Sequence, residues 1–366
     1  MTVYLLAGGG TAGHVNPLLA VADRLRERDP GAEVLVLGTA EGLEARLVPA
    51  RGYELLTIAK VPFPRRPNGA AVRFPKRFRD SVAEVREIIT QRGVDVVVGF
   101  GGYVSTPAYL AARRLGVPVA IHEANAKPGL ANRLGSRWAE TVGVVFSGTP
   151  LRHAEVVGMP LRREIEQLDR AALRGTAAEF FGLDPDRPVL LATGGSLGAR
   201  RINRTMTASA EAVTAAGWQV LHITGANSDV SDPGIADYRM LEYADRMDLA
   251  LSVADAAVSR AGAATVSELA ALGIPSVLVP YPVGNGEQRF NAADVVAAGG
   301  AVLVDDADFT PEWVAETVLP LLADEGRVAG MAAAAASVGH RDGTDRMIDL
   351  IDAASGANAG GTAADA

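Results

Sequence analysis

The chain has 366 residues, of which 48% are hydrophobic and only 5% aromatic, and it carries a formal net charge of −8 without any cysteine. This length allows two domains with separate cores. The lack of cysteine excludes disulfides and cysteine-bound metals, and the acidic balance excludes a general nucleic-acid binder. No apolar run approaches the roughly 18 residues of a membrane-spanning helix, and no signal-peptide pattern opens the chain, so we expect a cytoplasmic protein.

Apolar runs typical of strands alternate with amphipathic stretches typical of helices, which predicts parallel α/β sheets in both halves. In the first half the predicted strands are 3–7, 33–38, 53–59, 94–99, 117–122 and 142–146. In the second half they are 156–158, 188–193, 218–224, 255–259, 276–280 and 301–304. Helical patterns between them include 16–28, 81–92 and 200–216.

A glycine-rich loop at 8–13 follows the first strand and opens a helix, and a second one at 194–198 does the same half a chain later. Backbone N–H groups at a helix N-terminus bind anions, and the helix dipole adds about half a positive charge there. Two such loops indicate two nucleotide-fold domains that face a cleft. His14 stands at the first helix start, either as a general base or as a solvent-exposed residue without a role.

Both loops leave alternatives open. The first matches the dinucleotide fingerprint, but the second strand ends in Gly38-Thr39 instead of the acidic residue that an NAD site needs. The second loop matches the nucleophile elbow of α/β-hydrolases, with Ser196 as nucleophile and His222 or His340 as base. A hydrolase would leave the first loop unexplained.

The segment 62–79 is basic, contains no acidic residue, and holds three of the nine phenylalanines. Its basic and aromatic residues are Phe63, Arg65, Arg66, Arg73, Phe74, Lys76, Arg77, Phe78 and Arg79. This mixture is typical of an interfacial membrane patch, where each basic group contributes about 1 kcal/mol near an anionic leaflet. The alternative is a solvated basic loop.

The hinge between the domains is placed near 158–162, because Pro160 ends a strand and a helical pattern follows at once. We predict an N-terminal domain over 1–158 and a C-terminal domain over 159–340. The amphipathic segment 341–352 is expected to pack back on the first domain. The tail 353–366 has almost no large apolar residue and is expected to be disordered.

Residues 259–268 follow a strand and open another helix. Thr265 and Glu268 have the spacing of a capping box, which would give Glu268 a structural role, whereas the alternative is a carboxylate that accepts both hydroxyls of a ribose. The aspartate pair at 306 and 308 has the composition of a turn, so no metal site is predicted. Helix N-termini and arginine would then hold any diphosphate.

Six motifs together resemble the MurG family of bacterial peptidoglycan glycosyltransferases: 8–17, 99–103, 122–132, 194–200, 259–268 and 287–292. The resemblance spans about residues 1–350 and implies a GT-B fold, an α/β architecture of two Rossmann-like doubly wound domains facing a central cleft. It implies an inverting, metal-independent and cofactor-free transfer of N-acetylglucosamine from UDP-GlcNAc to the MurNAc 4-hydroxyl of lipid I (undecaprenyl-pyrophosphoryl-MurNAc-pentapeptide), which gives lipid II. It also implies peripheral attachment to the cytoplasmic face of an anionic membrane and partners among cell-wall synthesis proteins, with no nucleic acid.

Carried over position by position, the resemblance makes His14 the candidate base and Glu123 a supporting carboxylate. Contacts to UDP-GlcNAc are implied for Thr11, Ala12, Gly13, Asn125, Arg162, Ser196, Ala244, Glu268 and Gln288, with Asn203 and Asn291 near the site. Three positions depart from the family pattern: Ala12 stands where Gly is frequent, Leu197 where Gln is frequent, and Glu287 in the first place of a Gln pair. The remaining alternatives are another GT-B enzyme with a lipid or natural-product acceptor, a UDP-sugar epimerase, and a nucleotide-sugar sensor without turnover.

Overall fold

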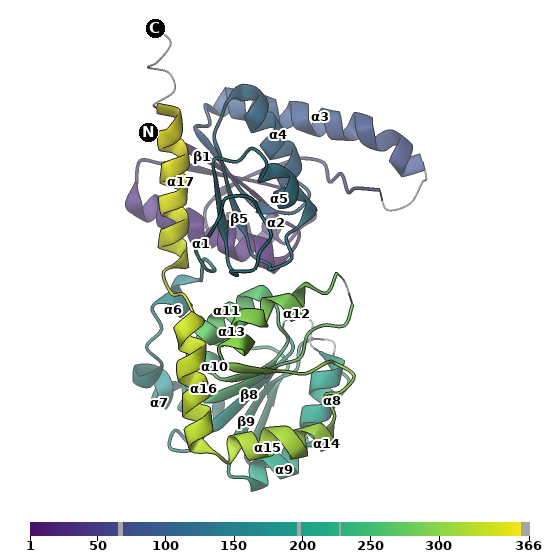
Figure 1. Cartoon of the computed structure of the whole chain (residues 1–366), viewed down its shortest axis with the longest axis vertical. Helices are drawn as coiled ribbons and strands as arrows, with labels where there is room; N and C mark the ends of the chain where they lie inside the picture. The colour runs from purple at the N-terminus through teal and green to yellow at the C-terminus, as the bar shows by residue number, and fades with distance from the viewer. Residues whose placement is uncertain (65–68, 196–198, 227, 284, 360–366) are drawn as a thin grey trace. The chain divides into compact units, whose positions relative to one another are not determined.

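The computed structural model describes residues 1–64, 69–195, 199–226, 228–283 and 285–359 (Figure 1). Its internal contacts divide the chain into two compact units. Unit 1 comprises Met1–Arg162 together with Asp342–Ala366, and unit 2 is the continuous segment Arg163–Arg341. Each unit is a Rossmann-like domain with a parallel sheet, which agrees with the α/β architecture of two such domains that the resemblance implies. The cleft expected between them stays a prediction.

Within the described residues, unit 1 contains a seven-stranded parallel sheet in the order β3-β2-β1-β4-β5-β6-β7. The strands are β1 (Val3–Gly8), β2 (Glu33–Gly38), β3 (Glu54–Thr57), β4 (Val96–Gly101), β5 (Val119–Glu123), β6 (Thr141–Val144) and β7 (Ala154–Val156). The strand order reverses between β1 and β4. Ligands of doubly wound sheets bind at the carboxyl ends of such a pair. The strand predicted at 156–158 was assigned to the second half, but as β7 it is the edge strand of this first sheet.

Helices cover both faces of this sheet. On one face α1 (Ala12–Arg28), α2 (Glu44–Ala50) and α17 (Gly343–Ala359) share a buried core. On the other face, α3 (Gly69–Arg92) and α4 (Ser105–Leu115) pack through residues such as Val85 and Tyr109. The short α5 (Leu130–Gly135) follows β5. Among the described residues no helix is both long and apolar enough to cross a membrane.

The C-terminal helix α17 runs beside α1 (Figure 1) and buries Met347, Ile348, Ile351 and Ala354. Arg24 and Arg28 of α1 form ion pairs with Asp345, and the Thr141 hydroxyl donates to the carbonyl of Leu350 at 3.0 Å. The prediction of a disordered tail from residue 353 is wrong up to Ala359, because the helix continues that far. Alanine is the best helix former, and the small Ala354 fits the buried face. The rest of the expected tail, 360–366, lies outside the described residues.

Unit 2 contains a six-stranded parallel sheet in the order β10-β9-β8-β11-β12-β13 within the described residues. The strands are β8 (Val189–Thr193), β9 (Gln219–Ile223), β10 (Tyr238–Leu241), β11 (Ala256–Ser259), β12 (Ser276–Leu278) and β13 (Ala301–Leu303). The order reverses between β8 and β11. Strand β10 was not predicted, because this short edge strand has no β-branched residue and interrupts its apolar side chains with Arg239.

The helices of unit 2 also lie on both sides of its sheet (Figure 1). They are α6 (Arg163–Glu166), α7 (Arg170–Phe181), α8 (Arg200–Ala208), α9 (Ala210–Ala215), α10 (Met247–Val253), α11 (Ala263–Ala271), α12 (Glu287–Asn291), α13 (Ala293–Ala297), α14 (Pro311–Trp313), the π-helical turn η1 (Val314–Val318), α15 (Leu319–Leu322) and α16 (Glu325–Val338). The single helix predicted over 200–216 is divided at Ser209 into α8 and α9. The starts of α8 and α11 follow β8 and β11, the two strands at the reversal point.

Candidate active site

The first glycine loop joins β1 to α1, and Thr11 is the N-cap of that helix. The Thr11 side chain does not cap the helix; its Oγ1 lies 3.3 Å from His14 Nδ1. His14 Nδ1 also lies 3.0 Å from the carbonyl oxygen of Gly9. A carbonyl only accepts hydrogen bonds, so this contact places the proton of the neutral imidazole on Nδ1. The lone pair is then on Nε2, the arrangement that a general base requires.

The Nε2 side of His14 faces the end of β4. A Cβ atom at Gly101 would come within 3.1 Å of Nε2, and Gly101 has φ +97°, a left-handed conformation that favours glycine. Glycine at this position therefore lets the imidazole approach the turn after β4. The glycine-rich ends of β1 and β4 meet around His14, which agrees with their neighbouring positions in the sheet.

Glu123 is buried at the end of β5 and has both oxygens occupied. Oε1 accepts from the Asn125 N–H at 2.9 Å, and Oε2 accepts from the Gly129 N–H and from Asn132 Nδ2, both at 3.0 Å. Burial raises the pKa of this carboxyl, and the three hydrogen bonds oppose that rise only in part. Glu123 thus orders the segment that carries Asn125.

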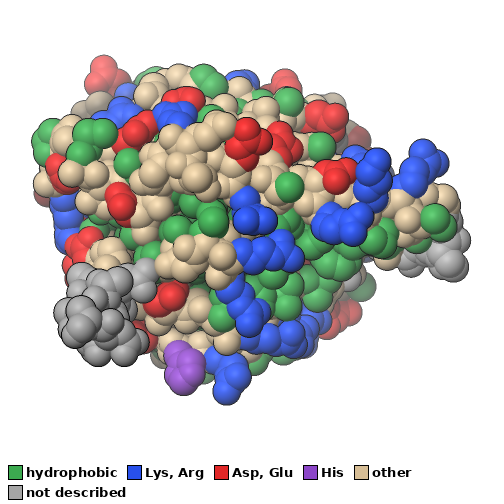
Figure 2. Space-filling model, turned by 90° about the horizontal axis from the view of Figure 1, so that it is seen from above, with side chains coloured by type: hydrophobic (Ala, Val, Ile, Leu, Met, Phe, Trp, Pro, Cys, Tyr) green, Lys and Arg blue, Asp and Glu red, His purple; other side chains and the backbone are tan. Residues whose placement is uncertain are grey.

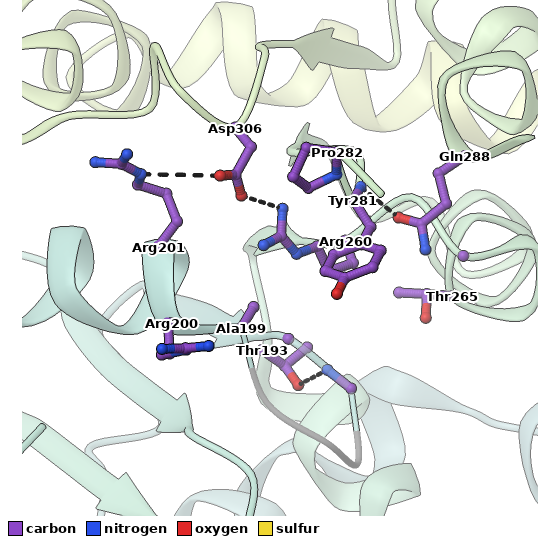
Figure 3. A pocket seen from close by; sticks show the side chains of 13 residues that line it. Thr193, Ala199, Arg200, Arg201, Arg260, Thr265, Tyr281, Pro282, Gln288 and Asp306 are labelled. Carbon is purple, nitrogen blue, oxygen red and sulfur yellow. Dashed lines mark hydrogen bonds and ion pairs between the residues drawn. The ribbon is translucent and has the colours of Figure 1, made fainter. Parts of the chain in front are cut away.

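Unit 2 has its own pocket of about 610 Å³ at the reversal point of its sheet (Figure 3). Its walls come from the ends of β8 and β11, the starts of α8 and α11, the segments after β12 and β13, and α12. The lining residues are Thr193, Gly194, Gly195, Ala199, Arg200, Arg201, Arg260, Gly262, Thr265, Tyr281, Pro282, Gln288 and Asp306. The N-caps of α8 and α11, Ala199 and Gly262, provide no side-chain cap bond. Backbone N–H groups at such helix starts are available for an anion.

Three arginines and one carboxylate give this pocket a positive charge. Asp306 lies 2.6 Å from Arg260 and 3.9 Å from Arg201 (Figure 3). Arg260 also donates to the carbonyls of Val279 and Pro280 at 3.0 and 3.2 Å, which fixes its guanidinium in the wall. Guanidinium groups and helix N-termini are the usual partners of phosphate oxygens, so the pocket suits a nucleotide diphosphate.

The structure brings only some of the predicted donor-binding residues together. Gln288 lines the pocket, and its Oε1 accepts from the Tyr281 N–H at 2.9 Å, which leaves its amide nitrogen for a ligand. Glu268 lies in α11, one turn beyond Thr265. The capping-box alternative for Glu268 is wrong, because the N-cap of α11 is Gly262 and Thr265 is the third helical residue.

The other predicted positions are more scattered. Asn203 and Asn291 are fully buried: Asn203 Nδ2 donates to the Thr224 carbonyl at 2.8 Å, and Asn291 Nδ2 to the Ala261 carbonyl at 3.3 Å. Both therefore hold loops in place. Ala244 lies in the loop after β10, and Arg162 ends the first segment of unit 1. Ser196 and Leu197 lie outside the described residues.

His222 cannot serve the serine-hydrolase alternative. Its Nε2 lies 3.1 Å from Asn203 Oδ1, and its Nδ1 lies 2.7 Å from the Tyr238 hydroxyl. Burial lowers the pKa of His222 to about 4. Since both ring nitrogens have buried partners, this histidine is a structural residue of the core.

The basic segment is largely helical. It was expected as a patch or a loop, but from Gly69 onward it forms the first turns of α3, while Arg65 and Arg66 lie outside the described residues. The rings of Phe63 and Phe74 lie 4.9 Å apart and those of Phe74 and Phe78 lie 5.4 Å apart. Figure 2 shows Lys and Arg side chains gathered over the projecting end of α3, beside hydrophobic ones. Phe63 is 51% and Val72 81% exposed, so the segment presents an apolar surface within a basic border.

Sequence reasoning missed the polar residues of the unit 2 pocket other than Gln288. Arg200 and Arg260 belong to quoted motifs, but their order in the chain gave no sign that they line one pocket with Arg201 and Asp306. Asp306 was correctly placed in a turn. In the described parts of the chain, no group of three or more His, Asp or Glu side chains is arranged to hold a metal ion.

Comparison with known proteins agrees with this geometry. Residues 4–144 match the glycosyltransferase family 28 N-terminal domain, and residues 189–347 match the C-terminal domain of the same family. A transferase of Leifsonia xyli, named UDP-N-acetylglucosamine–N-acetylmuramyl-(pentapeptide) pyrophosphoryl-undecaprenol N-acetylglucosamine transferase, is 69% identical over 96% of this chain and 98% of its own. A relative of the same name in Clavibacter sepedonicus is 66% identical over 96% of each chain. The crystal structure of Acinetobacter baumannii MurG matches with a TM-score of 0.80 and 30% identity, over 96% of this chain and 99% of that one.

Proposed function

The chain belongs to glycosyltransferase family 28, and on that premise we propose that it makes lipid II by transferring N-acetylglucosamine from UDP-GlcNAc to lipid I. The observation that carries the proposal is near full-length identity of 65–69% to transferases named for this reaction. The arginine-lined pocket of unit 2 supplies the chemistry that a UDP leaving group needs.

The donor would be held by unit 2. Its diphosphate would meet the N-termini of α8 and α11 and the arginines of the pocket, Gln288 would donate to a sugar hydroxyl, and Glu268 would accept from the ribose hydroxyls. As the bond between the anomeric carbon and the diphosphate breaks, the negative charge on UDP increases. Fixed positive charge and helix N-termini stabilise such charge without a metal.

The acceptor would be held by unit 1, where His14 Nε2 accepts the proton of the MurNAc 4-hydroxyl. The hydroxyl oxygen attacks the anomeric carbon on the face opposite the diphosphate, a new C–O bond forms as the old one breaks, and UDP leaves. One displacement of this kind inverts the anomeric configuration. Thr11, Ala12, Gly13 and Asn125 would border the transferred sugar.

The aromatic and basic side chains around the start of α3 would hold the enzyme on the cytoplasmic face of an anionic membrane. Phe63, Phe74, Phe78, Arg73, Lys76, Arg77 and Arg79 form this patch. Lipid I carries its undecaprenyl chain in the membrane, so a peripheral enzyme would meet its acceptor there. Other cell-wall synthesis proteins would be partners at the same surface.

Transfer of labelled N-acetylglucosamine from UDP-GlcNAc to a short-chain lipid I analogue tests the proposal. Turnover is expected, with the β-configured product, and excess EDTA is expected to leave the rate unchanged. Binding of UDP-GlcNAc without turnover would instead support a sensor. Loss of activity in EDTA that Mg²⁺ or Mn²⁺ restores would contradict the metal-independent mechanism.

A further inference from the structure

Glu44, the first residue of α2, is a fully buried carboxylate beside the first glycine loop. Its Oε2 accepts from the Gly10 N–H at 2.8 Å, and its Oε1 accepts from the N–H and the hydroxyl of Thr39 at 2.9 and 2.8 Å. Burial raises the pKa of Glu44, but these hydrogen bonds outweigh burial and leave the pKa below its usual value. Glu44 is thus a charged group at neutral pH.

The loop is shaped around this side chain. A Cβ atom at Gly9 would lie 2.4 Å from Glu44 Oε1, so only glycine lets the backbone pass this close to the carboxylate. A close approach of this kind fixes the position of the Gly9–Gly10 peptide relative to α2. The carboxylate therefore binds the backbone of the glycine loop from within the domain and is not exposed to solvent.

The Gly9–Gly10 peptide connects Glu44 to His14. Its N–H, on Gly10, donates to Glu44, and its C=O, on Gly9, lies 3.0 Å from His14 Nδ1. The N–H and the C=O of a trans peptide point in opposite directions, so the carboxylate and the imidazole bind the same peptide from its two sides. A hydrogen bond to the N–H makes the C=O a better acceptor, because chains of hydrogen bonds polarise one another.

We infer that Glu44 is a positioning residue for the transfer reaction, holding the Gly9–Gly10 peptide so that its carbonyl keeps His14 in the tautomer with an unprotonated Nε2. The inference rests on the proposed role of His14 as base. A carboxylate does this directly in serine proteases; here one peptide unit stands between the carboxylate and the imidazole. When His14 takes the hydroxyl proton, the negative charge of Glu44 and the polarised carbonyl stabilise the imidazolium.

Other charged and titratable groups lie near this pair. Glu123 and His122, at the end of β5, interact electrostatically with His14. Glu41, Lys60 and Tyr103 line a cavity of about 110 Å³ that Glu44 also borders. Glu41 is exposed and makes no hydrogen bond or ion pair within the described residues, so it is a matched control for the loss of one negative charge.

The test compares Glu44→Gln with Glu41→Gln in the transfer assay. Glu44→Gln keeps the side-chain shape but removes the charge, and one amide oxygen cannot accept from both Gly10 and Thr39. We expect kcat to fall by about 10–100-fold, the range seen for carboxylates that orient metal-ligating histidines, with KM for UDP-GlcNAc unchanged. The acidic limb of the pH–kcat profile should move to lower pH, because the variant lacks a negative charge near the proposed base. Glu41→Gln should change neither quantity.

Two further measurements separate the possible failures. If His14→Ala keeps its kcat, the proposed base is wrong; if His14→Ala loses kcat but Glu44→Gln keeps kcat and pH profile, only the role of Glu44 is wrong. Long-range ¹H–¹⁵N NMR of the histidine rings in the unaltered protein should show the neutral His14 ring protonated on Nδ1. A proton on Nε2 would overturn the inference whether or not the Glu44 variant folds.

Discussion

At the scale of single residues, His14 has the clearest geometry. Nδ1 is engaged by the Gly9 carbonyl, and Nε2 makes no hydrogen bond within the described residues. General-base catalysis contributes about 10²–10⁴-fold, so His14→Ala should reduce kcat by that factor. UDP-GlcNAc affinity, measured by calorimetry, should stay nearly constant because the donor pocket lies in unit 2.

His14→Asn is the matched variant for this prediction. Its amide nitrogen can still donate to the Gly9 carbonyl, but the side chain has no basic atom. It should be almost as slow as His14→Ala. Near-normal kcat in either variant would make His14 a structural residue of the helix start.

Glu268 gives a prediction about the donor. Its proposed hydrogen bonds to the ribose are of the charged type, so Glu268→Ala should weaken UDP binding by about 1.5–3 kcal/mol. The N-cap of α11 should be unaffected by the substitution, because Glu268 is not part of it. Binding of 2′-deoxy-UDP should be less sensitive to the substitution. A lower melting temperature with unchanged UDP affinity would show that Glu268 is structural.

Residues were predictable from the sequence when they belong to a local motif. His14 and Gln288 follow recognisable loops, and the structure places them at a loop and a pocket. Glu44, Arg201 and Asp306 were not predicted, because their roles depend on contacts with distant segments, such as that of Glu44 with Gly10, 34 positions earlier in the chain. The glycines at 38 and 42 that surround Glu44 were the available signal, since a buried carboxylate among backbone N–H groups needs such space.

At the scale of elements, most strands were predictable because buried parallel strands are nearly continuous apolar runs. The edge strand β10 and the N-terminal turns of α3 were missed for related reasons. β10 is short and combines apolar residues with a charged one, and α3 begins in a basic segment that contains Pro75. β10 depends on pairing with β9, and the start of α3 packs Phe74 against Phe63, which precedes the helix.

The start of α3 predicts binding to anionic vesicles. Phe63→Ser/Phe74→Ser removes apolar surface and Arg73→Ser/Lys76→Ser removes two exposed cations, and each pair should reduce co-sedimentation with phosphatidylglycerol vesicles. The loss for the basic pair is expected to be about 2 kcal/mol at low salt. Activity on a soluble acceptor should be retained by both pairs.

The control for this experiment removes two exposed cations elsewhere in unit 1, Arg46 and Arg86. The Arg46→Ser/Arg86→Ser variant should sediment like the unaltered protein. If the unaltered protein does not bind the vesicles at low salt, or if all variants bind them equally, the start of α3 is an ordinary solvent-exposed helix and not a membrane-binding surface.

At the scale of the whole molecule, each unit contains one buried histidine, His122 in unit 1 and His222 in unit 2. Burial of the ring lowers the pKa of each of them to about 4. The unfolded chain takes up these protons near pH 6.5, whereas the folded units resist protonation until about pH 4. The contribution of these two histidines to the free energy of unfolding should therefore be fully present above pH 6.5. It should fall as the pH drops toward 4, by up to roughly 1.4 kcal/mol per pH unit for each histidine.

Melting curves between pH 7 and 4.5 measure this loss. His222→Gln cannot titrate, so the stability of unit 2 should depend less on pH in that variant, although its absolute stability is lower. His153→Gln, at an exposed position, should keep the full dependence. A melting temperature that does not change over this range would contradict the prediction.

The helix α17 lies at the far end of the chain from the sheet that it covers, and this fixes an order of assembly during synthesis. A ribosome produces β1–β7 first, yet the part of the sheet face that packs against Met347, Ile348 and Ile351 stays uncovered until α17 has been made. Unit 2 is continuous from Arg163 to Arg341, so all its strands are available earlier. Nascent chains generally complete their N-terminal domain first. In this chain unit 2, which is inserted into unit 1, can finish folding first. Unit 1 is begun first but is completed last.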